Sequence, residues 1–205
     1  MNKIIPFILP VIYCLWGCGS QKVVATKYYV IEIPMDSVLE RFNDAAPPTE
    51  KYCEISQVDV NPAYSSVQIA NRNNSRAITY YSHHHWAIRP ATSFTRLTLD
   101  YFKHTPLFRN VSDRFWRVQP DYILETSVYH LEVIQDDHSF SAHLNLEFRL
   151  KETESDKDIV KHRADRYMEL ENNDLNLFAT AIGEIFYQEL AYLSDKIMTE
   201  IHVSP

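Results

Sequence analysis

The chain has 205 residues but only three glycines, and this scarcity excludes several kinds of nucleotide site. They are Gly17, Gly19 and Gly183. Loops that cradle a phosphate need several glycines where the backbone approaches the phosphate closely. Neither the Walker pattern nor the dinucleotide-binding fingerprint occurs. We therefore expect no nucleotide hydrolysis by this chain.

Signatures of common enzymes are missing as well. The sequence has no GxSxG elbow, no HExxH helix and no CxxC pair, so hydrolase, metalloprotease and thioredoxin functions have no support. A metal-dependent enzyme built on His83-His84-His85 is the alternative, because His83 and His85 would share one side of an extended segment. The other histidines show no paired spacing that supplies a third ligand. We expect an exposed polar loop here, and a protein without catalytic activity, metal or cofactor.

A long apolar run occurs only at the N-terminus, from Ile4 to Trp16, and it is too short to span a bilayer as a helix. It leads into Leu15-Trp16-Gly17-Cys18, which resembles the lipobox of bacterial lipoproteins, with a small residue before the cysteine that receives the lipid. The sequence therefore predicts a signal peptide at 1–17 that is removed, and acylation of Cys18, which includes palmitate.

The lipid would fix the location of the mature protein, since several acyl chains together anchor a protein stably to a membrane. Residues 18–27 form a predicted tether that can extend by about 30 Å. Gly19 stands where the inner-membrane retention signal has Asp, so we expect the periplasmic face of the outer membrane. Residues 28–205 are predicted to form a single periplasmic domain.

Cysteine and positive charge are scarce in the remaining chain. Cys14 leaves with the signal and Cys18 takes the lipid, so Cys53 has no partner for an internal disulfide. It lies among apolar and β-forming residues, where a lone thiol is usually a small core hydrophobe. The chain from Cys18 onward carries 19 basic and 27 acidic residues, a formal charge of −8. A nucleic-acid partner is therefore not expected.

Period-two alternation predicts three consecutive antiparallel strands in the second half of the chain. It is clearest from Phe140 to Leu150, where apolar even positions alternate with polar odd positions, as in a strand with one buried face. In the preceding run, 122–133, the apolar positions change from even to odd near Val128, which predicts a β-bulge. The third strand is predicted from Ile159 to Leu170.

Shorter strands and two helices complete the predicted fold. Strands are expected at 28–33 and 52–60, with a hairpin of 67–72 and 76–81 around Asn73-Asn74-Ser75. Apolar residues at three- and four-residue spacing predict helices at 90–104 and 175–201. We therefore expect an α+β two-layer sandwich, in which two long helices pack on a mainly antiparallel sheet.

Several short motifs occur in an order and spacing that match a known family. They are Tyr28-Tyr29-Val30-Ile31 before Pro34, Ile55, Val58 to Val60, Pro62 to Tyr64, Gln68-Ile69 with Arg72, Tyr80, Trp86, and Asp121-Tyr122-Ile123-Leu124. With them the chain resembles the ABC-type transport auxiliary lipoproteins, the PqiC-like family, from the lipidation site through the C-terminal helix.

The resemblance implies a non-enzymatic outer-membrane lipoprotein subunit of a lipid-transport system. In such a system an inner-membrane ABC transporter and an MCE-family protein span the periplasm, and another subunit hydrolyses ATP. The expected cargo is a phospholipid or another hydrophobic compound. A ring-like homo-oligomer would fit the symmetric end of such a partner.

The candidate partner-binding residues are Asn73 and Asn74 in the hairpin and Trp86, because exposed hairpins and aromatic residues often form interfaces. For Trp86 the alternative is that its side chain caps the core beside the first helix. Another periplasmic lipoprotein module, such as a cell-wall synthase activator or a lipopolysaccharide assembly factor, is an alternative function, because the fold alone does not separate these.

Overall fold

The computed structural model describes residues 24–42, 48–73, 76–136 and 139–203. The predicted signal peptide at 1–17, Cys18 and Asn74 lie outside these residues. The described elements are, in chain order, β1 (Lys27–Tyr29), α1 (Met35–Arg41), β2 (Thr49–Ile55), β3 (Asp59–Val60), β4 (Gln68–Asn73), β5 (Ile78–Trp86), α2 (Pro90–Lys103), β6 (Phe108–Ser112), β7 (Tyr122–Asp136), β8 (Ser139–Glu152), β9 (Lys157–Leu170) and α3 (Leu175–Val203).

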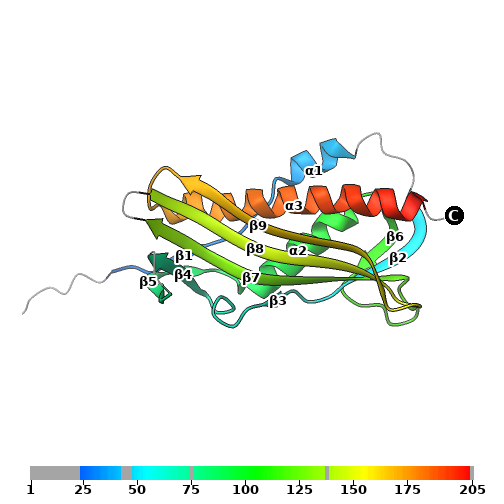
Figure 1. Ribbon diagram of the computed structural model, residues 1–205, viewed down its shortest axis with the longest axis horizontal. Coiled ribbons are helices and arrows are strands. Elements are labelled where there is room, and N and C mark those ends of the chain that lie inside the picture. Colours follow the sequence, from blue (N-terminus) through cyan, green and yellow to red (C-terminus); the bar gives the residue numbers. More distant parts are fainter. Residues whose placement is uncertain (1–23, 43–47, 74–75, 137–138, 204–205) are drawn as a thin grey trace, which may run out of the picture.

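Three long strands, β7, β8 and β9, pair with one another along their length and give the molecule its elongated shape (Figure 1). They pair in antiparallel order, as the alternation predicts. The register between β7 and β8 shifts between Val128 and His130, which confirms the predicted bulge. Beyond the bulge the inward positions of β7 become odd, so that Leu131 and Val133 continue the buried row begun by Leu124 and Val128.

The other edge of β7 is shared by several short strands, all of them parallel to it. β2 pairs with its beginning, β3 with its middle and β4 with its end. β6 extends the sheet beside β2, and β5 and β1 extend it beside β4. The predicted α+β class is confirmed, but the sheet is mixed rather than mainly antiparallel. The parallel pairings join segments far apart in the sequence, so no local pattern signals them.

Helices α2 and α3 cover one face of the sheet side by side. Phe186 of α3 contacts both Phe94 of α2, with ring centroids 4.7 Å apart, and Phe148 of β8, at 6.0 Å. All three side chains are fully buried, and burial of a large apolar side chain contributes roughly 1.5–3 kcal/mol. The carboxylate of Asp174 accepts a hydrogen bond from the backbone N–H of Asn176 and caps α3.

A third helix, α1, lies on the side of α3 that faces away from the sheet (Figure 1) and was not predicted. Arg41 at its C-terminal end donates two hydrogen bonds of 2.6 Å to Asp195 of α3. The extended segment 30–34 leads from β1 into α1 and crosses α3 at Gly183. Among the described residues no helix is long and apolar enough to cross a membrane.

Candidate functional site

The structure separates the predicted partner-binding residues into one exposed and one buried position. Asn73, at the end of β4, is exposed and accepts a hydrogen bond of 3.0 Å from the side chain of Asn71. Trp86 is only 2% exposed, and its ring packs against Phe178 of α3 with centroids 5.6 Å apart. Trp86 therefore caps the core and offers no surface to a partner, whereas the hairpin of β4 and β5 does.

The three consecutive histidines lie in strand β5 rather than in the expected polar loop. As alternation requires, His83 and His85 share one side of the strand. Two of the three rings contact aromatic residues of the neighbouring strand β1. The His84 ring stacks on Tyr29, and the Tyr29 hydroxyl lies 2.7 Å from Nδ1 of His84. The His85 ring lies beside Tyr28. In the described part of the chain no three His, Cys, Asp or Glu side chains gather in a geometry that could hold a metal.

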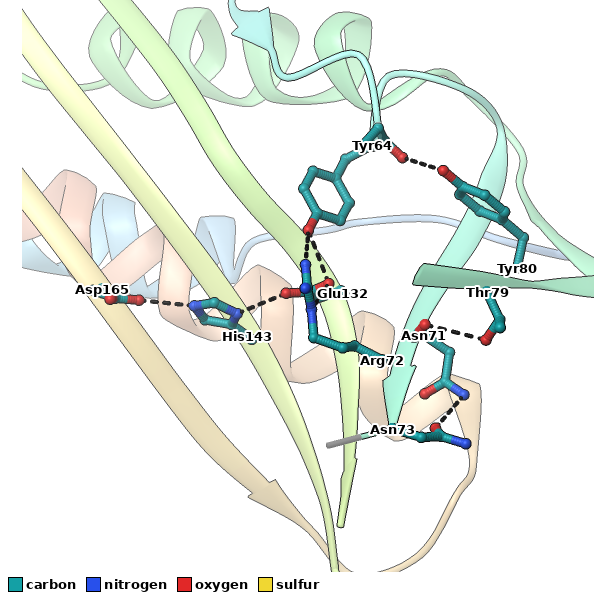
Figure 2. A network of polar contacts seen from close by, with 10 residues as sticks. Tyr64, Asn71, Arg72, Asn73, Thr79, Tyr80, Glu132, His143 and Asp165 are labelled. Carbon is teal, nitrogen blue, oxygen red and sulfur yellow. Dashed lines mark hydrogen bonds and ion pairs between the residues drawn. The ribbon is translucent and has the colours of Figure 1, made fainter. Parts of the chain in front are cut away.

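A buried polar network lies beside strand β4 of the hairpin, on the sheet face opposite the helices (Figure 2). Its centre is Glu132 of β7, which is 1% exposed. The Oε2 atom of Glu132 accepts hydrogen bonds from the hydroxyl of Tyr64, at 2.9 Å, and from Nε of Arg72, at 3.0 Å. Arg72 also donates to the Tyr64 hydroxyl, at 2.9 Å, so the three side chains form a closed triangle.

His143 of β8 extends this network across the sheet. Its Nδ1 lies 3.2 Å from Oε1 of Glu132, and its Nε2 lies 2.8 Å from Oδ1 of Asp165 on β9. The imidazole ring is also stacked between His130 and Tyr167, at centroid distances of 5.0 and 4.1 Å. The network therefore joins strands β4, β7, β8 and β9 through side chains as well as through the backbone.

The environment of Glu132 favours its ionised form. Burial alone would raise the pKa of the carboxyl group, but hydrogen bonds from His143, Tyr64 and Arg72 outweigh burial and hold the pKa below its ordinary value. The opposite holds for Tyr64, since burial and the neighbouring carboxylate raise its pKa to about 12. A carboxylate whose two oxygens are engaged and shielded from solvent is a structural anchor, and its effect is to fix the hairpin on the sheet.

A second buried carboxylate connects β9 to the helical layer. The Oε2 atom of Glu189, on α3, lies 2.6 Å from Nε2 of His162. Its Oε1 atom accepts a hydrogen bond of 2.6 Å from Nε of Arg166. The sequence reasoning missed Glu132 and Glu189 as buried carboxylates. Glu132 and its partner Arg72 are 60 residues apart in the sequence, and Glu189 and its partner His162 are 27 residues apart. A local sequence pattern therefore carries no signal for either pair.

Two hollows flank the segment 30–34. One, of about 370 Å³, lies between this segment and α2 and is lined mainly by apolar side chains. The other, of about 290 Å³, lies between the segment and α3. The larger hollow is lined by Val30, Met35, Ile88 and Leu97, together with the charged residues Glu32, Arg96 and Asp100.

The loop between β6 and β7 is an exposed feature that the sequence reasoning also missed. It carries Arg114-Phe115-Trp116-Arg117-Val118, and Trp116 is 83% exposed. The signal was present in the sequence, because two aromatic residues between two arginines, ahead of Pro120, are not typical of a solvated loop.

Comparison with known proteins gives likeness of fold only. No protein-family model and no curated protein matches the chain. The crystal structure of protein XCC0632 from Xanthomonas campestris, described under the family model DUF330, is similar with a TM-score of 0.65 and 16% identity, over 87% of this chain and 94% of that one. An uncharacterized protein is similar with a TM-score of 0.67 and 10% identity, over 85% and 99%. The hypothetical protein CT253 from Chlamydia trachomatis is similar with a TM-score of 0.50 and 8% identity, over 73% of this chain and 98% of that one. The chain thus shares its fold with these three proteins.

Proposed function

We propose that this chain is a non-enzymatic outer-membrane lipoprotein subunit of an MCE/ABC-type transport system for phospholipid or another hydrophobic compound. Acylation of Cys18 holds it on the periplasmic face of the membrane, and the domain docks an MCE-family partner. ATP hydrolysis belongs to the ABC transporter, in keeping with a chain that has no phosphate-binding loop.

The observation that carries the proposal is the structure formed by the segment from Val58 to Trp86, where the resemblance to the auxiliary lipoproteins is most specific. This segment forms β3 and the hairpin of β4 and β5. Residues of the matching motifs also make the buried network, since Tyr64 and Arg72 both contact Glu132. The motif residues thus have a physical role, which is to hold an exposed hairpin in a fixed position.

The position of the N-terminal strand agrees with this arrangement. β1 pairs with β5, so the predicted tether enters the domain beside the hairpin (Figure 1). A short tether of about 30 Å keeps this end of the domain close to the membrane. Pre-ordering of the hairpin lowers the entropy lost when a partner binds.

Two alternatives remain, and each has its own test. Another anchored periplasmic module, such as a cell-wall synthase activator or a lipopolysaccharide assembly factor, shares the anchor but not the partner. A metal-dependent enzyme using His83 and His85 requires stoichiometric metal in the purified protein, lost when both histidines are changed to Ala.

The proposal is tested by co-purification from detergent-solubilised membranes, with photo-crosslinkers at Asn73 and Ser82 of the hairpin and a control crosslinker at the exposed Lys157, at the opposite end of the long strands. We expect the MCE protein and the transporter in hairpin crosslinks but not in the control. Recovery of neither component, together with unaltered outer-membrane permeability in a deletion strain, would remove the transport function.

A further inference from the structure

The loop at 113–121 is fixed to the sheet at both of its ends. The backbone N–H of Phe115 donates a hydrogen bond of 3.2 Å to the carboxylate of Glu54, and the Phe115 ring packs edge-on against Tyr52. At the other end the Asp121 carboxylate accepts a hydrogen bond of 2.8 Å from the backbone N–H of Tyr52. The loop therefore presents its outer residues in a defined position.

The outer residues, 114–118, form what is called the tip below. Trp116 is 83% exposed, the largest fraction among the exposed large hydrophobic side chains of the described residues. The guanidinium carbon of Arg114 lies 4.7 Å from the centre of the Trp116 ring, a cation–π contact that restricts the indole. Arg117 and Val118 are exposed as well. The tip thus holds an indole and a valine out to solvent together with two guanidinium groups.

The two guanidinium groups of the tip are available to a ligand. In the part of the chain that the structure describes, neither Arg114 nor Arg117 forms an ion pair with a carboxylate. Asp121, at the end of the loop, is instead paired with Lys51 at 3.0 Å. Arginine binds phosphate oxygens with two parallel hydrogen bonds. The tip therefore combines phosphate-binding groups with an apolar ring.

This composition fits the boundary of a phospholipid bilayer. Tryptophan is enriched at membrane–water interfaces, because its ring is apolar and its N–H finds a partner among the headgroups. The long side chain of arginine reaches from the same depth to the lipid phosphates. A bilayer is also fluid, so it needs no preformed pocket to receive the indole.

A protein partner fits the tip less well, because the apolar surface there is small. A standard protein interface buries about 800 Å² on each partner and has an apolar core. The exposed large hydrophobic side chains of the tip are Trp116 and Val118, and the others among the described residues lie on or next to β1, α1, β4, β5, β9 and α3. One indole is little for a protein interface, but it suffices at a bilayer that an anchor already holds close.

Negative charge at this end of the sheet determines which bilayer fits. Asp113 is exposed beside the tip, and Glu152 and Glu154 line a hollow of about 350 Å³ together with Asp121. These carboxylates would be repelled by a strongly anionic surface. Zwitterionic lipid offers its phosphates to arginine without a net negative charge. The tip therefore matches a mainly zwitterionic bilayer.

The tip and the tether lie toward opposite ends of the molecule (Figure 1). The tip precedes Tyr122, the first residue of β7, whereas the register through β5 and β4 places β1 near Glu132. Ten residues of strand span about 33 Å. The predicted tether, about 30 Å long, leads away from β1 on the side opposite the tip. Both can meet one bilayer only if the long strands run along its surface.

We propose that the tip is a second membrane contact, in which Trp116 enters the boundary between headgroups and acyl chains while Arg114 and Arg117 bind lipid phosphates. The molecule then lies with its long axis along the membrane in which Cys18 is anchored. This inference rests on the lipid anchor of the proposed function but not on the MCE partner. It can therefore fail while the anchor and the docking both stand.

The test is the tryptophan fluorescence of the acylated chain, reconstituted in vesicles of phosphatidylethanolamine with a minor share of phosphatidylglycerol. Trp16 leaves with the predicted signal peptide, so the mature chain contains Trp86 and Trp116. Trp86 is 2% exposed and lies in the core. Bromine atoms on the lipid acyl chains quench an indole that lies close to them. We expect brominated lipid to quench the emission, and more strongly with bromine near the headgroups than near the chain ends.

Variants identify the residue that is quenched. Trp116→Phe should abolish the quenching and leave the emission of Trp86. The double variant Arg114→Gln, Arg117→Gln should reduce the quenching by about twofold or more, because the phosphate contacts that hold the indole at the surface are lost. Arg163→Gln is the matched control and should leave it unchanged, since this guanidinium also lies over an aromatic ring, that of Tyr129 at 5.2 Å, but on the long strands.

Three outcomes would overturn the inference. They are emission that brominated lipid does not quench, quenching that persists in Trp116→Phe, and quenching that the double arginine variant retains in full. The first of these measurements involves no substitution, so it does not depend on the folding of a variant. Protection of Trp116 from the aqueous quencher acrylamide, without quenching by brominated lipid, would assign the tip to a protein surface instead.

Discussion

Gly183 of α3 lies directly against the backbone carbonyl of Glu32, so close that a Cβ at position 183 would overlap with that oxygen. The contact is between two backbone segments, one helical and one extended, and neither can rotate away as a flexible side chain could. It is the point at which the segment 30–34 is seated on the helical layer.

Gly183→Ala should therefore destabilise the fold, although alanine is the better helix former. Overpacking in a closely packed region costs about 1–3 kcal/mol, and we expect a net loss in this range by urea unfolding. Thr180→Ala, one turn earlier and exposed, is the control and should change stability by less than about 0.5 kcal/mol. Equal stability of the two variants would contradict the contact.

Glu132 should make the stability of the fold depend on pH. The pKa of its carboxyl group in the folded state lies below 4.5, its ordinary value, so ionised Glu132 stabilises the fold above that pH. This contribution is lost as the pH falls through the folded-state pKa. Urea unfolding from pH 7 to pH 3 should show that Glu132→Gln is less stable than the wild type by about 3–5 kcal/mol at neutral pH. The stability of the variant should fall less than that of the wild type as the pH is lowered.

Glu125→Gln is the matched control for this measurement. Glu125 lies on the same strand and the same sheet face, but it is part of a half-exposed ion-pair group with Arg149 and Lys151. Exposed pairs contribute about 0–1 kcal/mol. If Glu125→Gln and Glu132→Gln lose similar stability, the buried network does not anchor the hairpin.

Variants at Trp86 and Asn73 should distinguish an effect on the stability of the fold from an effect on partner docking. Trp86→Ala removes a buried ring that packs on Phe178 and should cost about 3–5 kcal/mol in the free energy of unfolding. Asn73→Ala, at an exposed strand end, should cost less than about 0.5 kcal/mol. A fully stable Trp86→Ala protein that has lost its partner would show that the ring acts at the surface after all.

Cys53 should be unreactive in the folded protein. Its thiol is buried, and burial raises its pKa far above the usual range, so the reactive thiolate is rare. With a thiol-specific chromogenic reagent, the native mature chain should titrate no thiol and the unfolded chain one. A second thiol in the unfolded chain would mean that Cys18 carries no lipid.

Cys18→Ser should leave a folded protein that is soluble or keeps its signal, because the described core begins only near β1. Membrane fractionation and acyl labelling measure the outcome. A variant that still partitions with the outer membrane and still incorporates label would disprove the lipoprotein prediction.

The long elements could be predicted because their patterns are local. The alternation from Phe140 to Leu150 predicts β8, and the change of phase at Val128 predicts the bulge that the register of β7 confirms. The helices α2 and α3 end within two residues of their predicted bounds. In each case the spacing of apolar residues along the sequence equals the structural repeat of the helix or strand that forms.

The hairpin of β4 and β5 lies where it was predicted, but β6, α1 and the burial of the second face of the sheet could not be predicted. β6, with the sequence Phe108-Arg109-Asn110-Val111-Ser112, has no alternation and is a strand only because β2 lies beside it. His143, Asn145 and Glu147 occupy the polar side of β8, which predicts contact with water. Yet all three are buried; the Tyr167 ring of β9 stacks on His143, and Lys161 of β9 pairs with Glu147 at 3.4 Å.

The pairing of β1 also determines how the domain responds to force. β1 runs parallel to β5 through Lys27, Tyr28 and Tyr29, and the Tyr29 carbonyl accepts a further hydrogen bond from the Ala87 N–H, at 2.8 Å. A pull on the chain ahead of Lys27 acts along the strand, so these hydrogen bonds are loaded together in shear rather than opened one by one. A load applied through a membrane anchor would thus be transmitted from β1 to the hairpin, and through Arg72 to Glu132 of β7, without these strands separating one hydrogen bond at a time.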